Sequence, residues 1–90
     1  MTTLPKTKTK FVASNIRGVR EFRNYTQDYL AAKIGISQNA YSKIELGYSN
    51  INLERLFSIS QILQVEPSYL ISLDLKQLIE TISKKEDSKG

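Results

Sequence analysis

The segment from Thr26 to Leu46, TQDYLAAKIGISQNAYSKIEL, constrains the fold of this chain more than any other. Its first half places Leu30, Ala31 and Ile34 at helical spacing behind a threonine that suits an N-cap. Gly35 follows the last of these apolar residues, where a left-handed C-cap is wanted and glycine adopts it without steric cost. The pattern therefore predicts a short helix that ends in a tight turn.

A second short helix is predicted directly after that turn. Ser37 is a suitable N-cap, and the helix runs from Gln38 to Leu46 before Gly47 ends it. Polar side chains occupy positions where a buried helix would carry apolar ones. Two short helices joined in this way are typical of a unit that places its second helix in a DNA groove.

Composition limits the chemistry that the chain can perform. Ninety residues suffice for one small domain, and they include no cysteine and no histidine. Disulfides, thiol catalysis, imidazole bases and nearly every zinc site are thereby excluded, so we expect neither an enzyme nor a cofactor. The N-terminal residues lack the apolar run of a secretory signal, and no apolar segment approaches about twenty residues. We therefore expect a cytoplasmic protein that does not span a membrane.

The net charge of +4 is unevenly distributed. Between Phe11 and Ile82 seven basic residues balance seven acidic ones, but the part up to Arg55 has six basic against four acidic residues, and the part after it one against three. Residues 1–10 add three lysines and are predicted to form a flexible basic arm. The arm either reaches along a DNA backbone or groove, or only adds solubility. Residues 84–90 are predicted to be a disordered tail.

The rest of the chain predicts further helices. One extends from about Ser14 to Arg23, one follows an N-cap at Asn52, and one begins at Pro67. Two apolar stripes should face the core; they consist of Val12, Ile16, Val19 and Phe22, and of Leu53, Leu56, Phe57, Ile59, Ile62 and Leu63. The fold class is therefore all-α. A five-helix domain over residues 11–73 is followed by an additional amphipathic helix over residues 74–83, which either packs on its own domain or forms a dimer seam.

The two-helix segment resembles the helix-turn-helix of the phage repressor and Cro family, also called the XRE family of bacterial and phage regulators. The matching residues are Gln27, Leu30, Ala31, Gly35, Ile36, Ser37, Ile44, Glu45 and Gly47. The resemblance extends over five helices in order, from Asn15 to Leu73. It implies a repressor-like helical domain that binds double-stranded DNA.

The resemblance also implies roles for individual side chains. Gln27 takes the position of a phosphate contact, and it could also brace the second helix through Gln38. The family reads base edges from the exposed face of that helix, and its next loop contacts phosphates, although this chain lacks the lysines, arginines and proline that the loop commonly carries. The candidate DNA-binding residues are Gln27, Ser37, Gln38, Asn39, Ser42, Lys43, Tyr48, Ser49 and Asn50.

Three other residues are expected to be mainly structural. Arg20 and Glu45 resemble a pair that forms a salt bridge between two helices in some family members. Tyr41 stands where the family usually has an aliphatic or small residue. We expect it to pack partly inward, with its hydroxyl reaching solvent or a phosphate.

Two functions remain open at this point. The first is a sequence-specific transcriptional regulator that binds a palindromic operator as a homodimer, similar to small regulators such as restriction-modification controller proteins, and needs no small-molecule ligand. The alternative is an antitoxin-like protein-interaction module that uses the same fold to bind a protein partner. The neutral core and the loop that lacks lysine and arginine favour the alternative, whereas Gln27 and the polar helix face favour the regulator.

Overall fold

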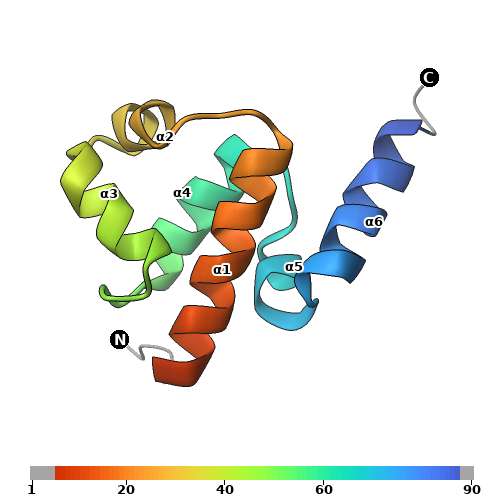
Figure 1. The fold of residues 1–90 in the computed structure, drawn as a ribbon, viewed down its shortest axis with the longest axis horizontal. Helices are drawn as coiled ribbons and strands as arrows, with labels where there is room; N and C mark the ends of the chain where they lie inside the picture. Colours follow the sequence, from red (N-terminus) through yellow and green to blue (C-terminus); the bar gives the residue numbers. More distant parts are fainter. Residues whose placement is uncertain (1–5, 88–90) are drawn as a thin grey trace.

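The computed structural model describes residues 6–87, and all regular secondary structure in this range is helical (Figure 1). The helices are α1 (Lys6–Phe22), α2 (Gln27–Ile34), α3 (Gln38–Glu45), α4 (Leu53–Leu63), α5 (Pro67–Ser72) and α6 (Leu75–Asp87). The predicted all-α class is confirmed. None of the helices in these residues is both long enough and apolar enough to span a membrane.

Short polar side chains determine where most of the helices begin. Hydroxyl, amide or carboxylate oxygens accept a hydrogen bond from the backbone amide three residues further on, at 2.8–3.1 Å, and they belong to Thr26, Ser37, Asn52 and Asp74. Gly35 ends α2 with a φ of 76°, and Gly47 follows α3 with a φ of 77°. Both glycines therefore stand where an L side chain would be strained.

The core is a single apolar cluster to which every helix except the very short α5 contributes several residues. Helix α1 crosses the molecule with α2, α3 and α4 on one side and α5 and α6 on the other (Figure 1). The large aliphatic residues that are completely buried are Val12, Ile16, Val19, Leu30, Ile59, Leu63, Leu70 and Leu78. Fully burying one such side chain stabilises the fold by about 1.5–3 kcal/mol.

Three residues assigned to the core stripes are instead on the surface. Phe22 is 37% exposed, Leu53 58% and Phe57 52%. Leu53 and Phe57 lie one helical turn apart and share a side of α4, whereas the buried Leu56 and Ile59 face the neighbouring helices. The apolar stripe of α4 is therefore wider than the surface that its neighbours cover.

Helix α1 begins earlier than predicted, at Lys6 rather than near Ser14. The prediction of a flexible arm over residues 1–10 is thus wrong for residues 6–10, and residues 1–5 lie outside the described part. Burial of Thr9, which is 2% exposed, anchors these first turns against the domain. Packing therefore outweighs the polar composition that suggested disorder.

The C-terminal helix also extends further than predicted. Helix α6 continues to Asp87, so the first four residues of the predicted tail are helical, and residues 88–90 lie outside the described part. Its apolar side packs against α1, where Leu78 is completely buried, Ile82 is 3% exposed, and the Leu75 side chain fills the space that a Cβ on Gly18 would need. Of the two arrangements expected for this helix, the structure shows it packed on its own domain, and a dimer seam stays a prediction.

Two polar side chains of the α1 region join distant helix ends to it. The Asn15 amide donates to the carbonyl oxygens of Leu70 at 3.0 Å and Leu73 at 2.8 Å, and the Arg23 Nε donates to the carbonyl of Leu63 at 2.9 Å. These bonds satisfy carbonyls that the ends of α5 and α4 leave unpaired. No local pattern in the sequence indicated them, because each partner is at least forty residues away.

Replacing Leu78 by alanine tests whether α6 belongs to the core of its own chain. The variant should lose about 2–5 kcal/mol of unfolding free energy, because a completely buried leucine leaves a cavity. The measurement is urea unfolding at two protein concentrations differing tenfold. A loss that depends on protein concentration, or one no larger than that of the control Ile79→Ala at a half-buried position, would contradict the intramolecular packing.

Candidate nucleic-acid interface

Helix α3 presents a polar face to solvent. Gln38, Asn39 and Lys43 are exposed, and Ser42 is half-buried. Gln38 lies one helical turn from Ser42, as Asn39 does from Lys43, so the four side chains form one continuous surface. We call these four residues the polar face of α3. The structure thus brings together the residues that were expected to read base edges.

The opposite side of α3 is fixed to the rest of the domain. Tyr41, Ile44 and Glu45 are buried, and the Ser37 hydroxyl accepts the amide hydrogen of Ala40 at 3.1 Å. The Ser37 side chain is therefore used as a helix cap, while its position at the start of α3 stays exposed. A helix held this firmly can present its outer face without rearrangement.

The carboxylate of Glu45 is the point at which three helices meet. Arg20 of α1 donates to it through Nε at 2.6 Å and Nη2 at 3.0 Å. Gln27 of α2 donates through Nε2 at 3.1 Å, and the hydroxyl of Tyr41 in α3 donates at 2.5 Å. We call these four residues the Glu45 cluster. The expected Arg20–Glu45 salt bridge is confirmed, and Arg20 also donates through Nη1 to the carbonyl of Tyr25 at 2.8 Å.

Burial and hydrogen bonding act on the pKa values of this cluster. Burial alone would raise the pKa of Glu45, but hydrogen bonds from Arg20, Tyr41 and Gln27 outweigh it and hold the pKa below its usual value. Burial, followed by the hydrogen bond to the Glu45 carboxylate, raises the pKa of Tyr41. The hydrogen bond to Glu45 raises the pKa of Arg20 despite its partial burial. At neutral pH the cluster therefore contains one carboxylate, one guanidinium and a protonated phenol.

The position of the Tyr41 hydroxyl differs from the expectation. Tyr41 is completely buried, and its hydroxyl donates to Glu45 rather than reaching solvent or a phosphate. A buried phenol needs a hydrogen-bond acceptor, and the carboxylate one turn along α3 supplies it. The sequence contained this signal, since Tyr41 and Glu45 are four residues apart on a helix.

Gln27 braces α3, but through Glu45 rather than through Gln38. It is half-buried in the first turn of α2, and because its partner is an acceptor, the amide nitrogen must face Glu45. An amide nitrogen carries two hydrogens, so one remains for a second acceptor. Gln27 can therefore hold α3 and a phosphate oxygen at once.

The loop after α3 lies at the other end of that helix. Tyr48 is 75% exposed, Ser49 is half-buried and Asn50 is exposed, while Ile51 turns inward with 3% exposure. Ile51 therefore packs into the core, while the residues before it face outward. The three polar residues offer hydroxyl and amide groups to a phosphate but no charge.

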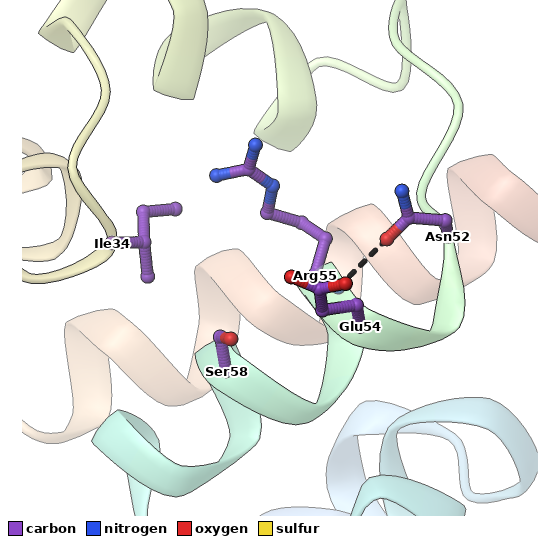
Figure 2. Close-up of a pocket in the computed structure, with 5 residues that line it drawn as sticks. All are labelled: Ile34, Asn52, Glu54, Arg55 and Ser58. Carbon is purple, nitrogen blue, oxygen red and sulfur yellow. Dashed lines mark hydrogen bonds between the residues drawn. The ribbon is translucent and has the colours of Figure 1, made fainter.

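A small hollow lies between the C-terminal end of α2 and the start of α4. Its volume is about 190 Å³, and it is lined by Ile34, Asn52, Glu54, Arg55 and Ser58. Figure 2 shows the Arg55 side chain extending from α4 between Ile34 and Asn52. Arg55 was not among the residues predicted to bind DNA, and its guanidinium can pair with an anionic group.

The chain is similar to known proteins of one family. Residues 16–70 match the model of a helix-turn-helix family. An uncharacterised HTH-type transcriptional regulator of Sinorhizobium fredii is 36% identical over 67 residues, which are 74% of this chain and 47% of that protein. A second such regulator, from Bacillus subtilis, is 36% identical over 59 residues, which are 66% of this chain and 51% of that protein. The chain thus spans about half the length of these curated relatives.

Solved structures share the fold. The DNA-binding domain of the P22 C2 repressor is 33% identical with a TM-score of 0.67, and the match covers 74% of this chain and 88% of that domain. The restriction-modification controller protein C.AhdI from Aeromonas hydrophila is 25% identical with a TM-score of 0.64, and the match covers 71% of this chain and 96% of that protein. The repressor-like architecture expected from the sequence is confirmed.

Replacing Glu45 by glutamine tests the cluster that holds α3. At pH 7 the variant should lose about 3–5 kcal/mol of unfolding free energy, because Arg20 is left without its charge partner in a largely buried site. The pKa of Glu45 is lower in the folded state than in the unfolded chain. The stabilisation that its carboxylate provides is therefore complete above about pH 4.5, and it is lost as the pH falls through the folded-state pKa. The difference in unfolding free energy between the wild type and the variant should therefore become smaller as the pH is lowered.

Urea unfolding between pH 7 and pH 3 measures this difference in unfolding free energy between the wild type and Glu45→Gln. Glu21→Gln is the matched control, because Glu21 pairs with Arg17 across 3.5 Å in an exposed position and should contribute less than about 1 kcal/mol. A difference that stays constant over the whole pH range would contradict the assignment.

Proposed function

The chain belongs to the helix-turn-helix family whose model it matches over residues 16–70, and on that premise we propose that it is a sequence-specific DNA-binding transcriptional regulator. It acts as a homodimer on a palindromic operator. The observation that carries the proposal is the polar face of α3, which is exposed on a helix whose other side is fixed by the Glu45 cluster. A helix that is already fixed in place loses little entropy when it binds.

The chemistry of the polar face matches the edges of base pairs in the major groove. Gln38 and Asn39 can each pair a donor and an acceptor with adenine, Lys43 can donate to the acceptors of guanine, and the Ser42 hydroxyl suits either. An α-helix fits the width of that groove. These residues would supply the sequence information.

Contacts to the DNA backbone would come from residues near both ends of α3. Gln27 has one amide hydrogen left for a phosphate oxygen, and it stands in the first turn of α2, where the helix dipole favours an anion. Tyr48, Ser49 and Asn50 would bind a phosphate at the other end of α3. Such contacts fix the orientation of α3, the recognition helix under this proposal. The base contacts provide the discrimination between DNA sequences.

We infer dimerisation from the small size of the polar face of α3. One short helix reaches few base pairs, and a two-fold dimer places two such helices about one DNA turn apart on a palindrome. The apolar side of α6 is used within its own chain, so this helix has mainly Leu75 and half-buried Ile79 left for a partner. Leu53 and Phe57 on α4 are a second exposed apolar surface that could be covered by another copy.

Two other exposed residues favour the second candidate, a protein-interaction module of antitoxin type. Leu46 and Tyr48 lie near the end of α3 and are 52% and 75% exposed. A protein partner could cover them without involving the polar face. The two functions differ in what the polar face is needed for, and this difference can be measured.

The test begins with selection of binding sites from a randomised duplex pool. The wild type should prefer the selected palindrome over scrambled DNA by about a thousandfold or more. In the double variant Gln38→Ala/Lys43→Ala this ratio should fall by roughly 30-fold or more, because each bidentate base contact contributes about 1–3 kcal/mol of discrimination.

The matched control is Gln61→Ala/Lys76→Ala, which removes the same two residue types from exposed positions of α4 and α6. Its ratio should equal that of the wild type. Selection of no consensus, with weak binding that disappears at high salt, would overturn the regulator and favour the protein-interaction module.

A further inference from the structure

The loop after the recognition helix has no cationic side chain. Residues 47–52 read Gly, Tyr, Ser, Asn, Ile and Asn, although this loop would meet the DNA backbone under the proposed function. Phosphate contacts contribute most of their affinity through lysine and arginine. A cation from another part of the chain could compensate for the missing charge.

Helix α1 comes into direct contact with this loop. A Cβ placed on Gly47 would lie 2.8 Å from Cγ and 3.4 Å from Cα of Lys10. The Lys10 residue of α1 therefore occupies the space that a side chain on Gly47 would need, and the φ of 77° at Gly47 also suits a glycine. Figure 1 shows the beginning of α1 beside the loop that joins α3 and α4.

Lys10 is the lysine that this contact directs along the loop. Its side-chain stem rests on Gly47 and the residue is exposed, so its ammonium group is accessible to a ligand of the loop. Lys8, two residues earlier, has its ammonium nitrogen 4.4 Å from the centre of the Phe11 ring and is half-buried. Only Lys10 of these two is thus both exposed and next to the loop.

We propose that Lys10 binds a DNA backbone phosphate beside the recognition helix, together with the Tyr48, Ser49 and Asn50 loop. This inference rests on the proposed function. It differs from the role of a flexible arm, because Lys10 is part of a folded helix and its stem is held against Gly47. An ammonium on a flexible stem suits a phosphate, which needs charge but no particular direction, better than a base edge.

A phosphate contact has a measurable signature in the salt dependence of binding. Each neutralised phosphate contributes about −0.9 to the slope of log K against log salt concentration. A homodimer carries two copies of Lys10, so Lys10→Gln should reduce the magnitude of the slope by about 1.8, and the affinity advantage of the wild type should shrink about 12-fold between 50 and 200 mM salt. The ratio of affinities for the selected and the scrambled duplex should not change, since a phosphate carries no sequence information.

Three further measurements make the result specific. Lys10→Arg should retain the wild-type slope, because it keeps the charge. Lys76→Gln, an exposed lysine of α6, should also retain it. Thermal unfolding should show that Lys10→Gln remains folded, since glutamine keeps the Cβ and Cγ atoms that rest on Gly47.

The outcomes separate the two proposals. If the wild type selects a palindrome but Lys10→Gln has the wild-type slope, the phosphate contact is wrong and the regulator stands. If Lys10→Gln alters the base preference instead, Lys10 touches bases and the phosphate assignment is again wrong. If the wild type selects no DNA site, the regulator and the Lys10 contact are overturned together.

Discussion

Four hydrogen bonds converge on the carboxylate of Glu45, and they join α1, α2 and α3 at one buried point. Arg20 supplies the compensating charge, while Tyr41 and Gln27 satisfy the remaining acceptor positions. A carboxylate without these donors would be costly to bury. Because the cluster lies directly beneath the polar face of α3, the interaction that stabilises the fold also determines the orientation of the side chains proposed to read DNA.

The two sides of α1 have different tasks. Toward α3, the helix contributes Arg20 to the Glu45 cluster and places Lys10 against Gly47, so it supports both ends of the proposed interface. Away from α3, Asn15 holds the end of α5 and the surface around Gly18 receives α6. One helix therefore connects the positively charged part of the chain with the part that α6 completes.

The parts of the fold that depend on local pattern could be predicted from the sequence. Caps such as Ser37 and Asn52 and the turn at Gly35 act within a few residues, and the predicted helix boundaries nearest to them match the structure. The exposure of the polar face followed from its spacing. Long-range contacts could not be predicted: burial of Thr9 extends α1, and Gln27 pairs with Glu45 rather than Gln38, because both depend on how distant helices meet. The exposure of Phe57 likewise depends on which side of α4 its neighbours cover.

A crystal structure of the full chain bound to its selected duplex would test most directly the claim that the Glu45 cluster presents α3 to DNA. We expect α3 in the major groove, Gln38 and Lys43 at base edges, and Gln27 donating to a phosphate oxygen while its bond to Glu45 persists. A complex in which the polar face of α3 points away from the DNA, or in which Gln27 leaves Glu45 and α3 shifts relative to α1, would contradict it.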